Sequence, residues 1–127
     1  FPGAREALAT LRARGLTLCL LSNAQAAFTR PELRLLDIES CFDHIWLSSE
    51  LGMKKPAPAL FRLPEREGFA VSECLMVGND DVCDCAGAAA VGMRSLYLRT
   101  AQSPARAGKL PEGCAAIRSI REVSLVD

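Results

Sequence analysis

Short apolar runs alternate with segments of helical periodicity along most of the chain. Residues 4–14 predict a helix, because Gly15 follows as a stop signal and one helical face carries Ala4, Ala7, Leu8 and Leu11. Residues 16–21 are almost wholly apolar, which is typical of a strand covered on both faces in a parallel sheet. The chain therefore opens with a helix followed by a buried strand.

The same alternation continues beyond the first strand. Residues 24–36 have a helical composition, but Pro31 is predicted to divide them into a turn and a second helix that begins at the proline. Two further helices are predicted, one over residues 58–68 that is bent at Pro64 and one over residues 82–91 that ends before Gly92. The strands predicted between these helices cover residues 42–48, 75–78 and 94–98.

The remaining segments are expected to be loops, apart from a short structured end. Residues 50–58 carry glycine, lysine and proline signals of a loop, and the tail from Arg99 opens in the same way. Residues 115–126 alternate apolar and polar positions and predict a short edge strand with a helical turn. Strands that alternate with helices predict an α/β fold with a mostly parallel sheet, and a length of 127 residues predicts a single domain.

Composition narrows the classes of function. The 15 basic and 15 acidic side chains cancel and are interspersed, so no surface for nucleic acid is expected. No apolar stretch approaches the roughly 20 residues that cross a bilayer, so no membrane span is expected either. The six cysteines form no C-x-x-C pair, which favours free thiols in a reducing, cytoplasmic environment.

Candidate chemistry lies directly after the predicted strands, where open parallel sheets bind their ligands. Ser22 and Asn23 follow the first strand, and a hydroxyl with nearby backbone N–H groups can hold an anionic oxygen there, although the same dipeptide is also a common helix cap. Lys55 precedes Pro56, which restrains the loop, and its ammonium can neutralise a phosphoryl oxygen or a carboxylate. An ordinary solvated lysine is the alternative.

The acidic loop after the third predicted strand is the strongest of these signals. Asn79, Asp80, Asp81 and Asp84 supply several hard oxygen donors behind Gly78, which permits a tight turn. Carboxylates gathered at a strand end repel one another unless a cation offsets them, and ligation by oxygen alone suits Mg²⁺. One of the two neighbouring aspartates, Asp80 or Asp81, is also expected to cap the following helix.

Three segments in this order resemble motifs II, III and IV of the haloacid dehalogenase (HAD) superfamily. They are L-L-S-N (20–23), S-S-E-L-G-M-K-K-P-A-P-A-L-F (48–61) and M-V-G-N-D-D-V-C-D-C-A-G-A-A-A-V-G-M (76–93). The resemblance implies a Rossmann-like three-layer sandwich. It also implies phosphoryl transfer to water through an aspartyl-phosphate with bound Mg²⁺.

Carried over position by position, the resemblance gives each candidate a role. Ser22 would hydrogen-bond the phosphoryl group, Asn23 would shape the same pocket, and Lys55 would stabilise the charge of the phosphoryl group and of the nucleophile. Asp84 would hold the metal with either Asn79 or Asp80. Position in the motif favours Asn79, whereas charge favours Asp80.

The family's first motif, D-x-D on a central strand, is absent from the sequence. The nucleophile and a third metal carboxylate are therefore missing, and residues 1–127 are expected to be an incomplete core that lacks its cap and first strand. Without that strand, the strands that end at Ser22 and Gly78 should each have an unpaired edge. The chain alone is expected to be inactive.

Two functions follow from these observations. The first is a Mg²⁺-dependent phosphatase for a small phosphorylated metabolite, of which this chain is the carboxy-terminal part. The carboxylates of motif IV favour this branch, because true haloacid dehalogenases, which resemble the superfamily, carry a serine-rich loop there. The alternative is a catalytically inactive HAD-like binding module, which the missing D-x-D and Asn79 suggest. The substrate identity and the oligomeric state are not specified by these residues.

Overall fold

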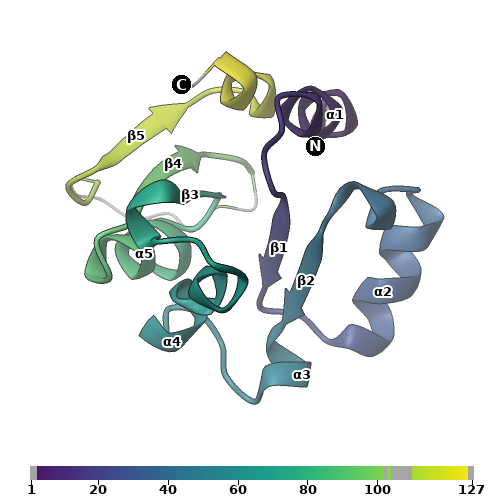
Figure 1. Ribbon diagram of the computed structural model, residues 1–127, viewed down its shortest axis with the longest axis horizontal. Coiled ribbons are helices and arrows are strands. Elements are labelled where there is room, and N and C mark those ends of the chain that lie inside the picture. Colours follow the sequence, from purple (N-terminus) through teal and green to yellow (C-terminus); the bar gives the residue numbers. More distant parts are fainter. Residues whose placement is uncertain (1–2, 102, 104–109, 126–127) are drawn as a thin grey trace. The chain divides into compact units, whose positions relative to one another are not determined.

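The computed structural model describes residues 3–101, 103 and 110–125. The chain divides into two compact units, the first made of residues 1–54 with 120–127 and the second of residues 55–119. Figure 1 labels their helices and strands, and each unit is described by itself.

The first unit contains a two-stranded parallel sheet with helices before, between and after its strands. Cys19 of β1 pairs with His44 of β2, and the register continues to Ser22 and Leu47. The elements in chain order are α1 (Ala4–Ala13), β1 (Cys19–Ser22), α2 (Ala26–Leu35), the 3-10 turn η1 (Glu39–Cys41), β2 (His44–Leu47), α3 (Ser48–Leu51) and the 3-10 helix η5 (Ile120–Leu125).

The second unit contains a three-stranded parallel sheet in the order β3-β4-β5. The central strand β4 has four buried residues in succession, from Ser95 to Leu98, and forms the middle of this unit's core. The elements are α4 (Pro58–Phe61), the 3-10 helices η2 (Leu63–Glu67) and η3 (Val71–Glu73), β3 (Leu75–Gly78), the π-helix η4 (Asp81–Ala86), α5 (Gly87–Ala90), β4 (Arg94–Leu98) and β5 (Cys114–Ile117).

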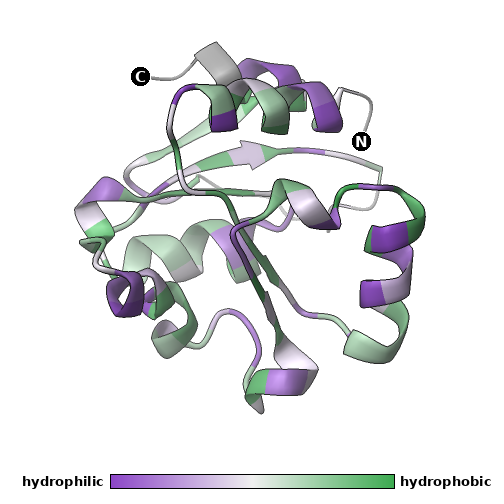
Figure 2. Cartoon of the chain, turned by 45° about the vertical axis from the view of Figure 1, so that its right-hand side comes forward, coloured by the Kyte–Doolittle hydropathy of each residue, from purple (hydrophilic) through white to green (hydrophobic). Residues whose placement is uncertain are grey.

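All described strand pairs are parallel, so the predicted α/β class with a parallel sheet is confirmed. The strands predicted at residues 75–78 and 94–98 are found with those bounds. Hydrophobic and hydrophilic residues alternate along the helices in Figure 2, as expected for helices with one covered face. The edge strand and helical turn expected near the carboxyl end are β5 and η5.

The first strand begins later than the apolar run predicts. α1 ends at Ala13, and the N–H of Leu16 donates back to the carbonyl of Leu11 at 3.3 Å, so the first residue of the run belongs to the turn that closes the helix. The expectation of a strand covered on both faces was also wrong, because Cys19 is exposed and the rest of β1 is half-buried.

Pro31 does not divide the second helix, contrary to the prediction. α2 runs through it, because its first turn forms well before the proline, with the N–H of Thr29 donating to the carbonyl of Gln25 at 2.9 Å. The N–H of Ala26 donates to the hydroxyl of Ser49 at 2.8 Å. A proline in an established helix removes one N–H donor without blocking its start.

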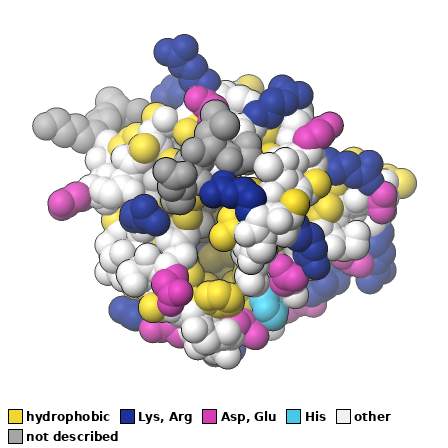
Figure 3. All heavy atoms as spheres, turned by 45° about the horizontal axis from the view of Figure 1, so that its top comes forward, with side chains coloured by type: hydrophobic (Ala, Val, Ile, Leu, Met, Phe, Trp, Pro, Cys, Tyr) yellow, Lys and Arg dark blue, Asp and Glu magenta, His cyan; other side chains and the backbone are white. Residues whose placement is uncertain are grey.

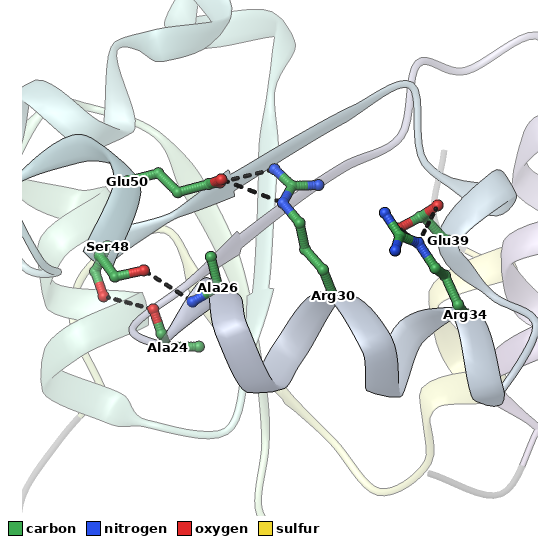
Figure 4. Close-up of polar contacts among 8 residues, drawn as sticks. Ala24, Ala26, Arg30, Arg34, Glu39, Ser48 and Glu50 are labelled. Carbon is green, nitrogen blue, oxygen red and sulfur yellow. Dashed lines mark hydrogen bonds and ion pairs between the residues drawn. The ribbon is translucent and has the colours of Figure 1, made fainter.

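The segment predicted as a loop from residue 50 begins inside a helical turn. α3 anchors the start of α2, since Ser48 Oγ donates to the carbonyl of Ala24 at 3.2 Å and Glu50 accepts two hydrogen bonds from the guanidinium of Arg30, at 2.7 and 3.2 Å. Figure 4 shows these contacts, with the ion pair of Arg34 and Glu39 farther along the helix. These side-chain contacts join sequence-distant residues, which local propensity does not reveal.

The predicted helix over residues 82–91 has two parts. Its first part, η4, is a π-helix, and α5 completes it. A Cβ on Gly87 would lie 2.6 Å from the Phe61 ring and 3.1 Å from Pro56, so the glycine allows this helix to pack closely against α4 and the preceding loop. Gly87 therefore serves packing.

Within the described residues, β1 pairs with β2 alone and β3 pairs with β4 alone. β1 and β3 are therefore each an edge strand of their own sheet, in agreement with the unpaired edges expected for the strands that end at Ser22 and Gly78. The helices of the described residues are all too short or too polar to cross a bilayer. Basic and acidic side chains are interspersed on the face shown in Figure 3.

Asp43 ties together three elements of the first unit and gives it a predicted response to acid. Its Oδ2 accepts from the N–H of Leu18 at 2.8 Å, and its Oδ1 lies 3.2 Å from the guanidinium of Arg12. The Leu18 N–H, and then Arg12, lower the pKa of Asp43. A lowered pKa stabilises the fold above the carboxyl's unfolded-state pKa, and this stability is lost as the pH falls through the folded-state pKa.

Asp43→Asn should therefore lower the unfolding midpoint at pH 7 and flatten its fall below about pH 4. Thermal unfolding followed by circular dichroism between pH 7 and pH 3 measures both effects. Asp37→Asn is the matched control, because Asp37 forms an ion pair with Arg5 in which both side chains are exposed, and such a pair contributes little to stability. Equal pH slopes for wild type and Asp43→Asn would contradict the assignment.

Candidate functional site

The acidic loop begins where β3 ends, and its first aspartate caps the helix that follows. Asp80 has an extended backbone, and its Oδ1 accepts from the N–H groups of Val82 and Cys83 at 3.0 and 2.8 Å. These are two of the donors that a helix start leaves unpaired. The expectation that Asp80 or Asp81 caps this helix is confirmed for Asp80.

Asp84 is the most buried carboxylate of the loop, with a side chain that is 4% exposed. Its Oδ2 accepts from the backbone N–H of Asp80 at 3.1 Å, and its Oδ1 forms an ion pair with Lys55 Nζ. The side chain therefore folds back on the start of its own helix. The π-type turn allows this return, since the N–H of Cys85 reaches the carbonyl of Asp80 at 3.4 Å, one residue beyond the usual helical spacing.

Gly78 is required at the end of β3 because the carboxyl group of Asp84 occupies the space of a side chain there. A Cβ on Gly78 would clash with the carboxylate carbon and oxygen of Asp84. The sequence suggested that this glycine permits a tight turn, and the structure adds a second reason, the close approach of Asp84.

Lys55 reaches Asp84 from the loop that precedes α4. Its side chain is only 10% exposed. Neighbouring Pro56 packs against the position of Gly87 at the start of α5, which holds the loop beside the acidic segment. The alternative of a solvated lysine is therefore wrong for Lys55. An ion pair this far removed from water is stable only when both charges have partners.

Asn79 is directed toward a polar loop that follows the neighbouring strand. Its Nδ2 donates to Thr100 Oγ1 at 3.3 Å. This hydrogen bond uses the nitrogen of the amide, so the amide oxygen is the atom through which Asn79 could hold a cation. The residues that the structure brings together at this strand end are Lys55, Asn79, Asp80, Asp84 and Thr100.

Thr100 was missed by the sequence analysis. Its signal was nevertheless present, because Thr100 lies only two residues after the end of β4, as Asn79 lies one residue after the end of β3. The rule that polar residues after parallel strands mark a site would have selected it.

Ser22 and Asn23 belong to the first unit. Ser22 is the half-buried last residue of β1, and Asn23 is exposed in the bend before α2. Both therefore lie at the carboxyl end of a parallel strand, as the sequence predicted. Asn23 is not the cap of α2, because Gln25 occupies the N-cap position.

The thiols near the acidic loop are poor nucleophiles. Burial raises the pKa of Cys83, and the Asp80 carboxylate raises it further. Burial, and then contact with Cys114, raises the pKa of Cys85 to about 12. Because a thiol reacts as its thiolate, both side chains stay unreactive near neutral pH. All six cysteines are free, in agreement with the sequence analysis.

The donor set is suited to a hard cation. The described residues contain no cluster of three or more His, Cys, Asp or Glu side chains that could hold a metal ion. What the loop offers is one amide, of Asn79, and three carboxylates, of Asp80, Asp81 and Asp84, all of them oxygen ligands of the kind that Mg²⁺ prefers. The set fits Mg²⁺ as part of a coordination shell, and a further carboxylate would strengthen it.

A profile of the haloacid dehalogenase-like hydrolases matches residues 1–92. The chain therefore belongs to this family of hydrolases. It is 34% identical to the ribulose-1,5-bisphosphate 5-phosphatase of Halopiger xanaduensis, over 76% of this chain and 41% of that protein. It is 33% identical to the phosphoserine phosphatase of Thermus thermophilus, over 100% of this chain and 51% of that protein. The chain thus spans about half the length of these relatives.

Solved structures of the family have the same fold. The HAD phosphatase of Thermococcus onnurineus superimposes with a TM-score of 0.83 and 26% identity, over 97% of this chain and 55% of that one. The 2-haloacid dehalogenase of Pseudomonas syringae superimposes with a TM-score of 0.75 and 28% identity, over 97% of this chain and 50% of that one. The Rossmann-like HAD fold is therefore shared by phosphatases and dehalogenases alike.

Breaking the buried ion pair from one side should destabilise the second unit strongly. Asp84→Asn leaves the Lys55 ammonium buried without its counter-charge, and we expect a loss of about 3–5 kcal/mol in the free energy of unfolding. Lys55→Met combined with Asp84→Asn removes both charges and should recover most of the loss. Urea unfolding of wild type, both single variants and the double variant gives the coupling energy.

The matched control is the exposed pair of Arg62 and Glu65, whose side chains are 52% and 47% exposed. Glu65→Gln should change the free energy of unfolding by less than about 1 kcal/mol. A similar small effect for Asp84→Asn would mean that the Lys55–Asp84 pair is not desolvated.

Proposed function

We propose that this chain is the carboxy-terminal part of a Mg²⁺-dependent phosphohydrolase that acts on a small phosphorylated metabolite through an aspartyl-phosphate. The observation that carries the proposal is the buried Lys55–Asp84 pair beside Asn79 and Asp80, at the carboxyl end of β3. The contact of a carboxylate, which could bind a cation, with an ammonium, which could bind a phosphoryl oxygen, supports the proposal.

The relatives support a phosphatase rather than a dehalogenase. The ribulose-1,5-bisphosphate, phosphoserine and phosphoglycolate phosphatases that resemble this chain all act on small phosphorylated molecules by name. The acidic version of the loop supports the same choice. Carboxylates would repel an anionic substrate unless a cation lies between them.

In the proposed site, Mg²⁺ would supply a positive charge that stabilises the phosphoryl group. Asp84 would hold it with the amide oxygen of Asn79. We prefer Asn79 to Asp80 because Asp80 Oδ1 already accepts two helix N–H groups. Asp80 would then shape the loop and add negative charge near the ion.

The side chains of Lys55, Ser22 and Asn23 would act on the phosphoryl group. The Lys55 ammonium carries a fixed positive charge and would offset the growing negative charge on the reacting oxygens. The Ser22 hydroxyl would donate a hydrogen bond to a phosphoryl oxygen, and Asn23 would shape the same pocket. Both lie at the carboxyl end of β1, where such a donor is expected.

The nucleophile would come from outside residues 1–127, because the sequence has no D-x-D pair. The chain covers only 41% and 51% of two relatives that it matches, which is consistent with a further segment in the active protein. Residues 1–127 would then form an incomplete core domain that does not turn over substrate alone. Six free thiols support a cytoplasmic setting.

We expect the coding sequence on the amino-terminal side of Phe1 to carry D-x-D directly after an apolar strand, followed by a cap's length of chain. Sequencing the complete reading frame tests this. A longer protein without such a pair would favour the alternative of a catalytically inactive HAD-like binding module.

The complete protein should hydrolyse p-nitrophenyl phosphate in the presence of Mg²⁺ and lose activity when EDTA removes the ion. Asp84→Asn should lower kcat by about 10²–10³, in the range found for loss of one preorganised electrostatic group. Release of p-nitrophenol measures the rate, and Glu65→Gln serves as an active control on the same unit. Equal rates with and without Mg²⁺ would overturn the metal dependence, and no phosphatase activity at all would overturn the proposed function.

A further inference from the structure

Asn79 and Thr100 follow two neighbouring strands and meet at their carboxyl ends. Gly78 at the end of β3 is paired with Tyr97 of β4, so the two strands end at the same edge of the sheet, where Asn79 directly follows β3 and Thr100 lies two residues after β4. The contact is direct, with Asn79 Nδ2 at 3.3 Å from Thr100 Oγ1. Both side chains are half-buried, which limits the access of water to this hydrogen bond.

Thr100 is itself fixed by the turn that it begins. Its backbone N–H donates to Ser103 Oγ at 2.8 Å, and the N–H of Ser103 donates back to the carbonyl of Thr100 at 3.0 Å. The two hydroxyl oxygens are 3.4 Å apart. When Thr100 Oγ1 accepts from Asn79, its own proton can be donated to Ser103, so the turn holds the hydroxyl ready as an acceptor.

The contact matters because it determines which end of the Asn79 amide faces the proposed cation. The two ends of an asparagine side chain differ, and only the oxygen can bind a cation, whereas the two oxygens of an aspartate are equivalent. An asparagine at this position must therefore be held with the correct end outward, a requirement that an aspartate does not have.

We propose that Thr100 is the positioning residue that meets this requirement, by engaging the amide nitrogen of Asn79 and so committing its oxygen to the cation. The inference rests on the proposed function, in which Asn79 is a metal ligand. Thr100 contributes no ligand and touches no reacting atom. It acts through the orientation of Asn79 alone.

Replacement of Thr100 by valine keeps the shape of the side chain and removes the acceptor. In the complete protein, Thr100→Val should weaken Mn²⁺ binding by about 10-fold or more, the usual size of the effect when a partner of a metal ligand is lost. Thr100→Ser retains the hydroxyl and should bind Mn²⁺ within about twofold of wild type. Electron paramagnetic resonance of free Mn²⁺, without substrate, measures these affinities independently of turnover.

A second comparison separates orientation from general damage to the loop. In an Asn79→Asp background the ligand has two equivalent oxygens, so adding Thr100→Val should change Mn²⁺ affinity by less than about twofold. An equal loss in both backgrounds would show that Thr100 supports the loop rather than the amide, and would overturn the proposal. Circular dichroism of each variant checks that the fold is retained.

Asn79→Ala distinguishes failure of this inference from failure of the site on which it rests. If Asn79→Ala weakens Mn²⁺ binding and Thr100→Val does not, Asn79 is a ligand that needs no help from Thr100, and the inference is wrong. If Asn79→Ala binds Mn²⁺ as wild type does, the ligand assignment itself is wrong and the inference falls with it. Weakening by both single variants, with rescue by Thr100→Ser, supports the inference.

Discussion

The carboxylate of Asp84 is the group around which the second unit's strand end is arranged. Its side chain is 4% exposed, and a buried charge is tolerated only when its oxygens are bonded. Lys55 satisfies one oxygen and the Asp80 N–H the other. Gly78 leaves the space that the carboxylate fills, and the π-type turn brings the side chain back over β3. Four separate features of the backbone and sequence thus depend on one charged group.

A buried ion pair is weak evidence for stability, because apolar side chains of similar size can stabilise a fold as well or better. Its presence in this chain is explained more directly by chemistry. A carboxylate is a ligand for a hard cation, and the Lys55 ammonium supplies the counter-charge that allows this carboxylate to be buried. The stable fold and the proposed reaction therefore use the same pair of side chains.

The sequence predicted best those elements that depend on local pattern. The strands at residues 75–78 and 94–98 are short apolar runs between clear breakers, and their bounds were correct. The sequence-based predictions failed where contacts between residues far apart in the chain determine the ends of a helix or strand. Pro31 suggested a helix start, yet α2 begins before the proline. Its first residue, Ala26, is bonded to Ser49, and Arg30 forms an ion pair with Glu50. The apolar run from Leu16 suggested a strand, yet the N–H of Leu16 donates to the carbonyl of Leu11 in α1.

In the candidate site, too, some residues could be assigned from the sequence and others only from the structure. Residues of recognisable chemical type in a motif, such as Lys55 and Asp84, were found from the sequence, and the structure adds their contact. The two neighbours Asn79 and Asp80 could not be separated by type or by position. Hydrogen bonds distinguish them, because Asp80 Oδ1 accepts from two helix N–H groups whereas the Asn79 amide is held at Thr100. Such bonds depend on the exact end of β3 and on the loop after β4, which no local pattern encodes.

A neutral amide at position 79 also affects the electrostatics of the proposed site. The three acidic residues Asp80, Asp81 and Asp84 together with Lys55 have a formal net charge of −2, which an aspartate at position 79 would make −3. A less negative loop attracts a divalent cation more weakly, but it also repels an anionic phosphate ester less. Because a neutral ligand contributes little long-range attraction, its contribution to binding depends on the orientation of its dipole. The polar turn at Thr100 is thus of greater consequence for this chain than it would be for a relative with an aspartate in the same place.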